Sequence, residues 1–306
     1  MRRLRKQRIN IVVHTFSEDD LYHYRSTMAE IVAATKDARL GVWLDPWGVG
    51  GIFGGEAFSR AALDEPSWQQ VASDGKRLPA CCPNNPGFQR FVLDWIESAC
   101  RTDADGIFWD EPHFFMDRTS NVLGCFCMYC KELANDMHIT EADFRIMSVL
   151  SFLAWAFKHV SAARKENILC LLPEDINKYN WIASIEAANI YGLTNLGTDP
   201  FWLSRGEEPE YSISRFGGTV MSAAAKLGIK SHLWIQGFKI PSGREAEITR
   251  AVLAAGRLLP NVIAIWGFDG CAAMSSVACQ RPHRAWQAFL DGIYSLRGDT
   301  RDSEKR

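Results

Sequence analysis

The sequence predicts an α/β fold, a single-domain (β/α)8 TIM barrel over residues 1–298. Short apolar runs alternate with longer segments of helical period along the chain, which is typical of repeated βα units with a parallel sheet. Eight such units fit in 306 residues, and a TIM barrel takes about 250 residues plus insertions. An open doubly wound sheet would need a Gly-rich phosphate turn after its first strand, and none follows His14. The charged tail, residues 299–306, is expected to be disordered.

Each predicted strand is a short run rich in branched or aromatic residues. The segments between them carry apolar residues at three- and four-residue steps, most clearly Phe88, Val92, Trp95 and Ala99. Pro86 precedes this stripe, as at the first position of many helices. Similar stripes are predicted at 141–162, 212–227, 244–258 and 283–296. The predicted strands are 9–14, 40–44, 78–82, 106–110, 167–172, 190–196, 231–236 and 262–266.

Charge and cysteine content limit the possible partners. A formal charge of −2 and a pI near 6.4 give no basic field for nucleic acid, in spite of the basic residues at the start. The chain has no run of about 18 apolar residues, so no membrane partner is expected. The apolar run at 9–13 is too short for a signal peptide, and nine clustered cysteines favour a metal or free thiols in a reducing cytoplasm. The expected location is therefore cytoplasmic, with a homo-oligomer left open.

Residues that follow the predicted strands indicate a carbohydrate substrate. The carboxyl ends of barrel strands line the active site whatever the reaction. Carboxylates, amides and tryptophans dominate there; tryptophan faces stack on sugar rings, and the polar groups bind hydroxyls. No lysine ends a strand, which argues against a Schiff-base aldolase. The candidate substrate-binding residues are His14, Asp45, Trp47, Trp109, His113, Trp202, Trp234, Gln236 and Asp269.

Two adjacent acids end the fourth predicted strand. Glycoside hydrolysis needs one carboxyl group that donates a proton and one that acts as nucleophile or base. Asp110 and Glu111 follow an apolar strand, and aromatic neighbours would raise a carboxyl pKa by desolvation. Asp199, after the sixth strand, is the expected partner. Acids after strands also cap helices or pair with arginines, so a structural role stays open.

Three cysteines follow the fourth strand within six residues, at positions 125, 127 and 130. Three close thiolates can bind one side of a tetrahedral Zn²⁺ and need a fourth ligand from elsewhere. Cys81, or Cys82 as its substitute, is placed to supply that ligand at the end of the third strand. The alternative is that these thiols are buried as small apolar side chains.

Around residues 80–135 the chain resembles the zinc-containing β-galactosidases of glycoside hydrolase family 42. The Cys-x-Cys-x-x-Cys run followed by a helix is the specific part of this resemblance. The resemblance implies a structural Zn²⁺ that pins the loop after the fourth strand. The ligands that it implies are Cys81, Cys125, Cys127 and Cys130.

The segment Asp110-Glu111-Pro112 is similar to the Asn-Glu-Pro motif of the wider clan of these barrels. In that clan the glutamate is the acid/base, so the resemblance implies this role for Glu111. The chain differs from the clan at position 110, which is Asp instead of Asn. It also has Gln236 where the clan's nucleophilic glutamate ends the seventh strand.

The missing strand-seven glutamate leaves three hypotheses. In the first, Glu111 is the acid and Asp199 or Asp269 is its partner. In the second, Asp110 is a nucleophile and Asp199 the acid/base, an arrangement similar to the α-galactosidase and α-glucosidase barrels. In the third, the chain is a non-catalytic carbohydrate-binding protein on a hydrolase barrel. A metal-dependent isomerase would need His and carboxylate ligands at several strand ends, and only two histidines, His14 and His113, are so placed.

Overall fold

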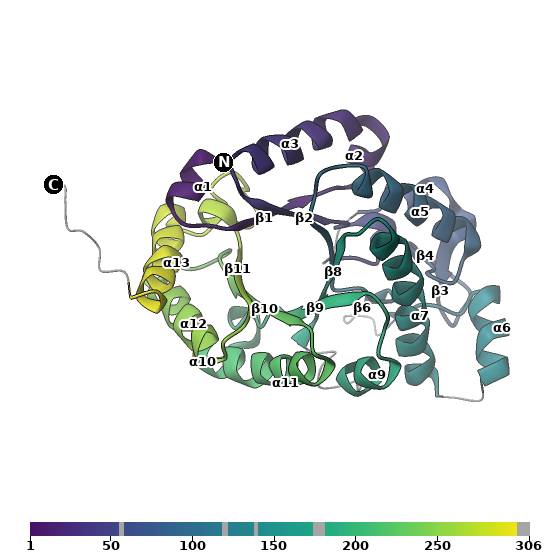
Figure 1. Cartoon of the computed structure of the whole chain (residues 1–306). Coiled ribbons are helices and arrows are strands. Elements are labelled where there is room, and N and C mark those ends of the chain that lie inside the picture. The colour runs from purple at the N-terminus through teal and green to yellow at the C-terminus, as the bar shows by residue number, and fades with distance from the viewer. Residues whose placement is uncertain (55–57, 118–121, 138–139, 174–180, 299–306) are drawn as a thin grey trace. The chain divides into compact units, whose positions relative to one another are not determined.

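The computed structural model describes residues 1–54, 58–117, 122–137, 140–173 and 181–298 (Figure 1). The predicted tail, 299–306, lies outside these residues. Two compact units divide the chain: Met1–Cys170 with Tyr179–Thr194, and Leu171–Lys178 with Asn195–Arg306. No helix in the described part of the chain has both the length and the apolar character needed to cross a membrane.

In the first unit, helices and strands alternate along the chain as the sequence predicts. Helix α5 begins at Pro86, and the side chain of Asn85 caps it by accepting hydrogen bonds from the backbone N–H groups of Gly87 (2.8 Å) and Phe88 (3.3 Å). The main elements are α1 (Arg2–Lys6), β1 (Ile11–Thr15), α2 (Glu18–His23), α3 (Arg25–Asp37), β2 (Gly41–Asp45), η1 (Val49–Gly51), α4 (Arg60–Asp64), η2 (Pro66–Trp68), β3 (Gln69–Val71), β4 (Arg77–Cys81), α5 (Pro86–Cys100), β5 (Gly106–Asp110), β6 (Met116–Asp117), β7 (Val122–Leu123), α6 (Met128–Met137), α7 (Glu141–Ala162), β8 (Glu166–Leu171) and α9 (Trp181–Ala188).

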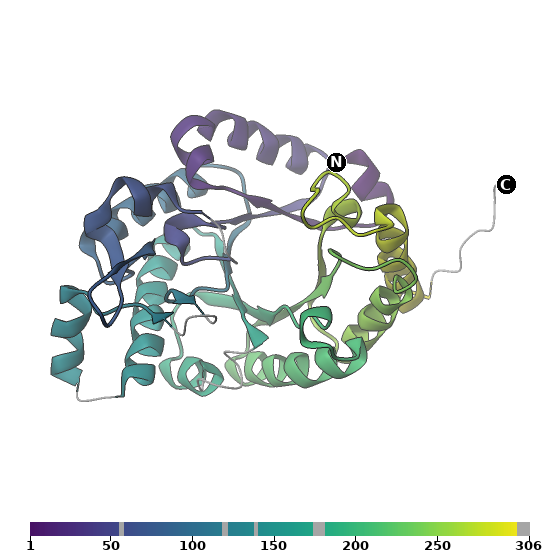
Figure 2. The same ribbon diagram turned by 180° about the vertical axis from the view of Figure 1, so that it is seen from behind.

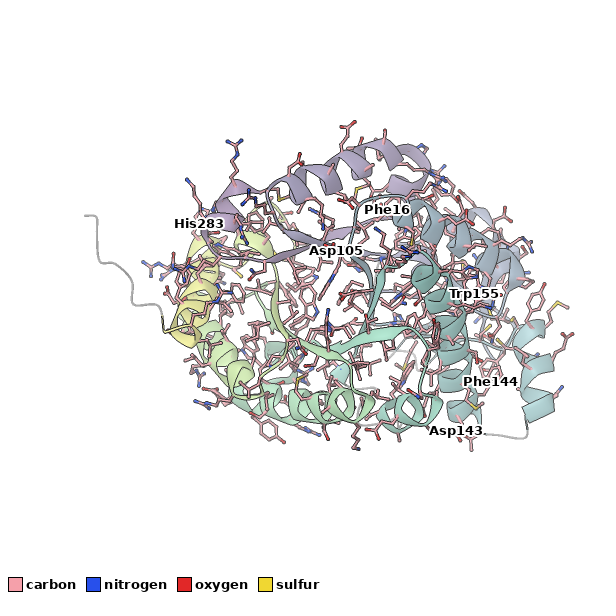
Figure 3. The ribbon with its side chains drawn as sticks, in the orientation of Figure 1. Phe16, Asp105, Asp143, Phe144, Trp155 and His283 are labelled. Atoms are coloured by element: carbon pink, nitrogen blue, oxygen red, sulfur yellow. The ribbon has the colours of Figure 1, made fainter. Side chains whose placement is uncertain are left out.

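Strands β1, β2, β5 and β8 of this unit pair in parallel in chain order. Figures 1 and 2 show α3 beside β1 and β2 from both directions. Asp105, labelled in Figure 3, precedes β5 and accepts hydrogen bonds from the backbone N–H of Val42 (2.7 Å) and from Lys36 Nζ (2.6 Å). One carboxylate thus joins β2 and α3 to the start of β5.

The contacts of Trp109 on β5 show which face of these strands packs against the helices. Its ring packs against Trp95 of α5 and Phe157 of α7, with ring centroids 6.2 and 5.9 Å apart. Because side chains alternate along a strand, Phe108 and Asp110 point to the opposite face. We call this face, turned away from the helices, the inner face of the unit.

The third predicted strand forms β4, but β4 pairs antiparallel with β3 in a separate two-stranded sheet. Arg77 and Pro79 are exposed on this strand and alternate with the buried Leu78 and Ala80. Proline has no N–H for a ladder, so Pro79 is poorly suited to a central strand. This pairing is the one departure from the predicted order of parallel strands among the described residues.

In the second unit, β9, β10 and β11 also pair in parallel and in chain order. Figures 1 and 2 show α11 and α12 along one side of β10. Leu233 of β10 lies on that side, next to Gly217: a Cβ atom added to Gly217 would be 3.0 Å from Cδ1 of Leu233. His232, Trp234 and Gln236 alternate with it and point to the other face. The elements are β9 (Leu193–Thr198), η3 (Leu203–Arg205), α10 (Pro209–Ser212), η4 (Ile213–Gly217), α11 (Gly218–Leu227), β10 (Lys230–Gln236), α12 (Ala246–Arg257), β11 (Val262–Trp266), η5 (Phe268–Cys271) and α13 (Pro282–Leu296).

The fold class is therefore α/β of the TIM-barrel type, as the sequence predicts. Each unit contributes parallel strands in chain order with helices packed against one face. The carboxyl ends of the strands are the places where this architecture positions functional side chains.

Candidate active site and thiol cluster

Asp110 is the last residue of β5, and its side chain lies on the inner face of the first unit. It is half-buried there. Trp109, its neighbour, points the other way and is fully buried between the strand and the helices. The strand therefore directs Asp110 and Phe108 to the inner face and Trp109 away from it.

Asp45 is the last residue of β2 and lies on the same inner face. Two residues before each acid, Trp43 and Phe108 stack with ring planes 2° apart and centroids 6.4 Å apart, so both strands direct these side chains to one face. Asp45 is only 9% exposed, and its Oδ1 has no hydrogen-bond partner in the described part of the structure. The backbone N–H of Trp47 donates a hydrogen bond to the same carboxyl group.

Burial and like charge raise the pKa of both aspartates. Burial raises the pKa of Asp110 well above the ordinary value of 3.8, and the negative charge of Glu111 adds to this effect. Burial also raises the pKa of Asp45, and the negative charges of Asp110 and Glu111 raise it further. The hydrogen bond from the backbone of Trp47 lowers it in part. A carboxyl group that stays neutral near pH 7 can act as a proton donor.

Glu111 continues the chain beyond β5 in a constrained backbone conformation. Its φ of 43° lies in the left-handed region, which costs an L-residue about 1–2 kcal/mol. Its N–H donates to the carbonyl oxygen of Cys170 (3.1 Å), and its own carbonyl oxygen accepts a hydrogen bond from Nδ1 of His113 (2.6 Å). Hydrogen bonds on both sides of the residue hold this conformation in place, as is common at functional sites.

The Gly-rich segment 48–54 after β2 is tied back to the end of β5. The backbone N–H of Gly54 donates to the carbonyl oxygen of Asp110 (2.7 Å), and the N–H of His113 donates to that of Ile52 (3.0 Å). Gly54 has a φ of 68°, and a Cβ placed on it would lie 1.8 Å from Cδ1 of Trp47. The half-buried indole of Trp47 thus packs directly on Gly54, next to the backbone of Asp110.

Glu18 holds the other side of this segment, and the sequence gives no hint of that role. Its carboxylate is 5% exposed and accepts hydrogen bonds from the N–H of Gly50 (2.7 Å), Oγ of Ser59 (2.9 Å) and the N–H of Ala61 (2.8 Å). With three donors it is a structural acid. In the sequence it stands in the first turn of a short acidic helix behind the N-cap Ser17, where an acid is ordinary capping chemistry.

Three residues proposed from the sequence as sugar ligands face protein instead, and these assignments are corrected. Trp109 is completely buried, and its Nε1 donates to Oδ1 of Asn167 (3.0 Å). Trp202 is completely buried too, and its Nε1 donates to Oε2 of Glu247 (2.8 Å). Nε2 of His14 bonds Oγ1 of the buried Thr35 on α3 (3.0 Å), so its ring faces a helix.

The remaining proposed residues lie in the second unit. Asp199 is 6% exposed and follows β9 directly. Gln236 ends β10, and its amide accepts from the N–H of Leu203 and donates to the carbonyl of Phe238, both at 3.3 Å. Trp234 is 7% exposed on the same strand face. Oδ1 of Asp269 pairs with Nδ1 of His283, labelled in Figure 3, at 3.3 Å.

The second unit also holds a buried polar pair that the sequence reasoning missed. Nδ1 of His232 donates to Oδ1 of Asn195 (2.8 Å), both residues are fully buried, and burial lowers the pKa of His232 to about 3. His232 therefore stays neutral at physiological pH. Its place on the strand, two and four residues before Trp234 and Gln236, was the signal that could have found it.

Four cysteine thiols meet in the first unit and could hold a metal ion. The sulfur atoms of Cys82, Cys125, Cys127 and Cys130 all lie within 4.8 Å of one another. Among the described residues, this is the one cluster of side chains that could bind a metal ion. Sγ of Cys82 is 3.4 Å from that of Cys130 and 3.6 Å from that of Cys127. Hydrogen bonds among the four thiols lower the pKa of Cys127 and raise the pKa values of Cys82 and Cys130.

The fourth thiol is that of Cys82 and not that of Cys81, which corrects the first choice made from the sequence. β4 ends at Cys81, and consecutive residues of an extended chain point in opposite directions. Cys81 instead interacts with Ser59, and burial raises the pKa of its thiol. Cys82 was the substitute that the sequence offered.

Hydrogen bonds also connect the thiol cluster to the β3–β4 hairpin. Gln70, fully buried on β3, donates to the carbonyl of Cys81 (3.0 Å) and accepts from the N–H of Phe115 (3.0 Å). Nδ2 of Asn84 donates to Sγ of Cys130 (3.2 Å). The cluster and the segment that follows the acids after β5 thus belong to one hydrogen-bonded assembly.

Comparisons with known proteins place the fold and go no further. No protein-family model matches the chain, and no curated protein matches it by sequence. Among solved structures, the PgaB (BpsB) glycoside hydrolase domain from Bordetella bronchiseptica is similar with a TM-score of 0.54 at 12% identity, over 88% of this chain and 96% of that domain.

A fungal β-1,4-galactanase is similar with a TM-score of 0.56 at 12% identity, over 95% of this chain and 90% of the other. D-psicose 3-epimerase from Clostridium cellulolyticum H10 is similar with a TM-score of 0.52 at 10% identity, over 96% of this chain and 90% of the other. At such identities these likenesses show that the chain shares its barrel fold with glycoside hydrolase domains and with sugar epimerases.

Proposed function

We propose that this chain hydrolyses a glycosidic bond and that Asp110 donates the proton to the leaving oxygen. The observation that carries the proposal is the position of Asp110 and Asp45. Both side chains lie on one face of the unit, at the ends of adjacent parallel strands. Burial raises the pKa of each and so favours the protonated form that a proton donor needs. Hydrolysis of a glycoside requires such a neutral acid together with an ionised partner.

The fold neighbours support the class of substrate. The solved barrels similar to this chain include a glycoside hydrolase domain, β-1,4-galactanases and a D-psicose 3-epimerase with D-tagatose. All of these proteins are named for carbohydrates, in two different reaction classes. The acids after β2 and β5 favour hydrolysis, which needs two carboxyl groups and no further reactant besides water.

In this proposal Glu111 is the ionised neighbour of Asp110. Its negative charge adds to the burial that raises the pKa of Asp110, and a carboxylate close to the sugar stabilises the positive charge of an oxocarbenium-like transition state. This reverses the roles that the sequence resemblance implies, in which the glutamate is the acid/base. Both residues remain necessary for turnover.

The sugar is held by an aromatic face and by hydroxyl ligands. Trp47, packed on Gly54 beside Asp110, offers its indole to a sugar ring, and His113 is held near the acids by its hydrogen bond to Glu111. From the second unit, the sequence proposes Trp234, Gln236 and Asp269 as hydroxyl ligands. It also proposes Asp199 as the partner acid. Replacing each of these four residues and measuring the rate of hydrolysis tests the assignments.

For the thiol cluster we propose a structural Zn²⁺ bound by Cys82, Cys125, Cys127 and Cys130. Tetrahedral Zn²⁺ with bonds of about 2.3 Å keeps its sulfur ligands about 3.8 Å apart. The sulfur atom of Cys82 lies 3.4 Å from that of Cys130 and 3.6 Å from that of Cys127, and all four sulfur atoms lie within 4.8 Å of one another. The N–H of Cys127 and Nδ2 of Asn84 donate to sulfur atoms of the cluster, as outer partners of thiolate ligands do. Four thiolates leave no open position for water, so the ion would stabilise the loop without entering the reaction.

A panel of aryl α- and β-glycosides tests the proposed function directly. Purified protein is expected to release the phenol from at least one member, and Asp110→Asn and Glu111→Gln are each expected to lower the rate by about 10²–10⁴-fold. Normal turnover in both variants would contradict the assignment. Binding of a glycan by the same protein without any turnover would favour the non-catalytic carbohydrate-binding protein.

A further inference from the structure

We propose that Gln70 is a positioning residue of this site. Its side-chain amide couples the thiol cluster to the segment that carries Asp110 and Glu111, so that loading the cluster with metal changes the rate of a reaction in which the metal takes no part. This inference rests on the proposed function and on the proposed Zn²⁺ site. It assigns to Gln70 no contact with the substrate.

Gln70 joins two backbone segments through the two ends of its amide. It lies in β3 between the partly exposed Gln69 and Val71, and it is completely buried. Nε2 donates to the carbonyl oxygen of Cys81 (3.0 Å), and Oε1 accepts from the backbone N–H of Phe115 (3.0 Å). A carbonyl oxygen accepts and an N–H donates, so these partners fix the orientation of the amide. The planar group therefore holds both segments at a set distance.

On one side, the amide contacts the backbone next to two of the four thiols. Cys81, which accepts from the amide, directly precedes Cys82. Gly124 directly precedes Cys125, and a Cβ on Gly124 would lie 2.1 Å from Oε1 of Gln70. Two ligand cysteines thus follow residues that pack on this amide. A displacement of either cysteine must move the amide or break a contact with it.

On the other side, Phe115 is held by both of its backbone polar groups. Its N–H donates to Oε1 of Gln70. Its carbonyl oxygen accepts from the N–H of Gly124 (2.9 Å), the residue that packs on the same amide. The position of Phe115 is therefore set from the side of the thiols.

The segment between Phe115 and the acids is short and constrained. Three residues separate Phe115 from Glu111, and the ring of one of them, Pro112, fixes its φ near about −65°. Glu111 holds a φ of 43°, and its carbonyl oxygen accepts from Nδ1 of His113 (2.6 Å). Few dihedral angles remain to absorb a displacement. A shift of Phe115 is therefore passed to Glu111 and to the end of β5 at Asp110.

Burial makes the amide of Gln70 follow its partners. Water cannot replace a hydrogen bond that is lost in a completely buried place, so breaking one leaves a polar atom unsatisfied. The preceding residue, Gln69, offers a comparison. It is partly exposed, and its Nε2 donates to the carbonyl oxygen of Ala62 (2.7 Å) in α4, outside the cluster and the acid-bearing segment. Gln69 is therefore a matched control for Gln70.

The first test needs no substrate. Gln70→Met keeps the length of the side chain and loses both hydrogen bonds, and Gln69→Met is its control. Both variants keep the four thiols and should bind as much Zn²⁺ as the wild type. Backbone hydrogen exchange at residues 111–115, followed by mass spectrometry, should be at least about tenfold faster in Gln70→Met and in wild type from which a chelator has removed Zn²⁺. It should be unchanged in Gln69→Met, and exchange in β10 should be unchanged throughout.

The second test compares rates on the aryl glycoside that the wild type hydrolyses fastest. With Zn²⁺ bound, kcat of Gln70→Met should fall at least about tenfold at little changed KM, because a displacement of about 1 Å can cost about 100-fold in rate. Removing Zn²⁺ should lower kcat of the wild type and of Gln69→Met by a similar factor. It should change kcat of Gln70→Met by less than about threefold, since the connection is already cut. If Gln70 only stabilised the fold, the two effects would multiply.

Equal kcat in the two methionine variants, effects that multiply, or unchanged exchange at residues 111–115 would overturn the inference. So would faster exchange that extends to β10, or a wild type that binds no Zn²⁺. If Gln70→Met does not fold, Gly124→Ala takes its place, because the new Cβ displaces the amide, and the same exchange is expected. If the exchange behaves as expected while no glycoside is hydrolysed, the coupling stands and the hydrolase assignment fails.

Discussion

The backbone N–H of Gly54 donates a hydrogen bond to the carbonyl oxygen of Asp110 at 2.7 Å, and the indole of Trp47 packs on the same glycine. One residue without a side chain thus joins the segment after β2 to the end of β5. It also sets the distance between the aromatic ring proposed to bind the sugar and the acid proposed to protonate it.

Replacing this glycine should therefore disturb activity more than stability. Gly54→Ala brings a Cβ to within 1.8 Å of Trp47 and forces the indole to move, in addition to the cost of a φ of 68°. We expect at least a tenfold loss of kcat/KM, because a displacement of about 1 Å can cost about 100-fold in rate.

Gly75→Ala is the matched control: its φ is 87° and a Cβ there contacts nothing within 4 Å. It should lose about 1–2 kcal/mol of stability and keep its activity; equal activities of the two variants would show that Trp47 has no part in the site.

The backbone of Glu111 offers a second test, in which two variants that both lose activity differ in stability. Glu111→Gly removes the cost of a φ of 43°, while Glu111→Gln removes the charge and keeps that cost. Urea unfolding should give Glu111→Gly about 1 kcal/mol more stability than Glu111→Gln. Both variants should lose activity. A less stable glycine variant would mean that the side chain, and not the backbone, dominates the energetics at this position.

The raised pKa of Asp110 predicts a pH-dependent gain in stability on mutation to asparagine. Because folding raises this pKa, the folded state prefers the neutral form. The stability contribution of the group is fully present below its ordinary pKa of 3.8 and is lost as the pH rises through the folded value. Asn is neutral at every pH, so Asp110→Asn should melt above the wild type at pH 7, and the difference should vanish near pH 3. Glu18→Gln, which places an amide among three donors, should melt below the wild type at pH 7. A lower melting temperature for Asp110→Asn at pH 7 would identify Asp110 as a structural acid.

Adjacent cysteines allow a controlled test of the metal. Purified wild type should contain close to one Zn²⁺ per chain, and Cys82→Ser should lose it together with thermal stability, because a thiolate ligand is gone. Cys81→Ser, one residue away and outside the cluster, should keep the ion. Elemental analysis of both variants decides the point. Equal metal content in the two variants, or none in the wild type, would refute the four-thiolate site.

The sequence predicted these parts of the molecule unequally, for physical reasons. The hydrophobic alternation predicted the parallel strands, and β5 and β11 have the predicted limits because apolar runs with sharp ends define them. The acids after β5 were found by the same means. For the third strand, the apolar pattern was correct, but it does not encode the partner, and β4 pairs with β3 instead.

Errors in the site came from the direction in which side chains point. A one-residue step along a strand reverses the face, which separates Trp109 from Asp110 and Cys81 from Cys82. Alternation counted from Asp110 would have turned Trp109 toward the helices. The partner of Trp202, Glu247, lies 45 residues away in the chain, and nothing in the local sequence indicates such a contact. Asp45 was found as a candidate, but its pairing with Asp110 depends on the register of two strands.

Hydrolysis of two glycosides with different leaving groups by Asp110→Asn tests the central claim, that Asp110 is the proton donor, most directly. Phenoxide leaves slowly without a proton, so the variant should hydrolyse the phenyl glycoside about 10²–10⁴-fold more slowly than the wild type. 2,4-Dinitrophenoxide leaves without protonation, and the variant should hydrolyse that glycoside at close to the wild-type rate. Equal losses on both glycosides, or no loss on the phenyl glycoside, would contradict the assignment of Asp110 as the acid.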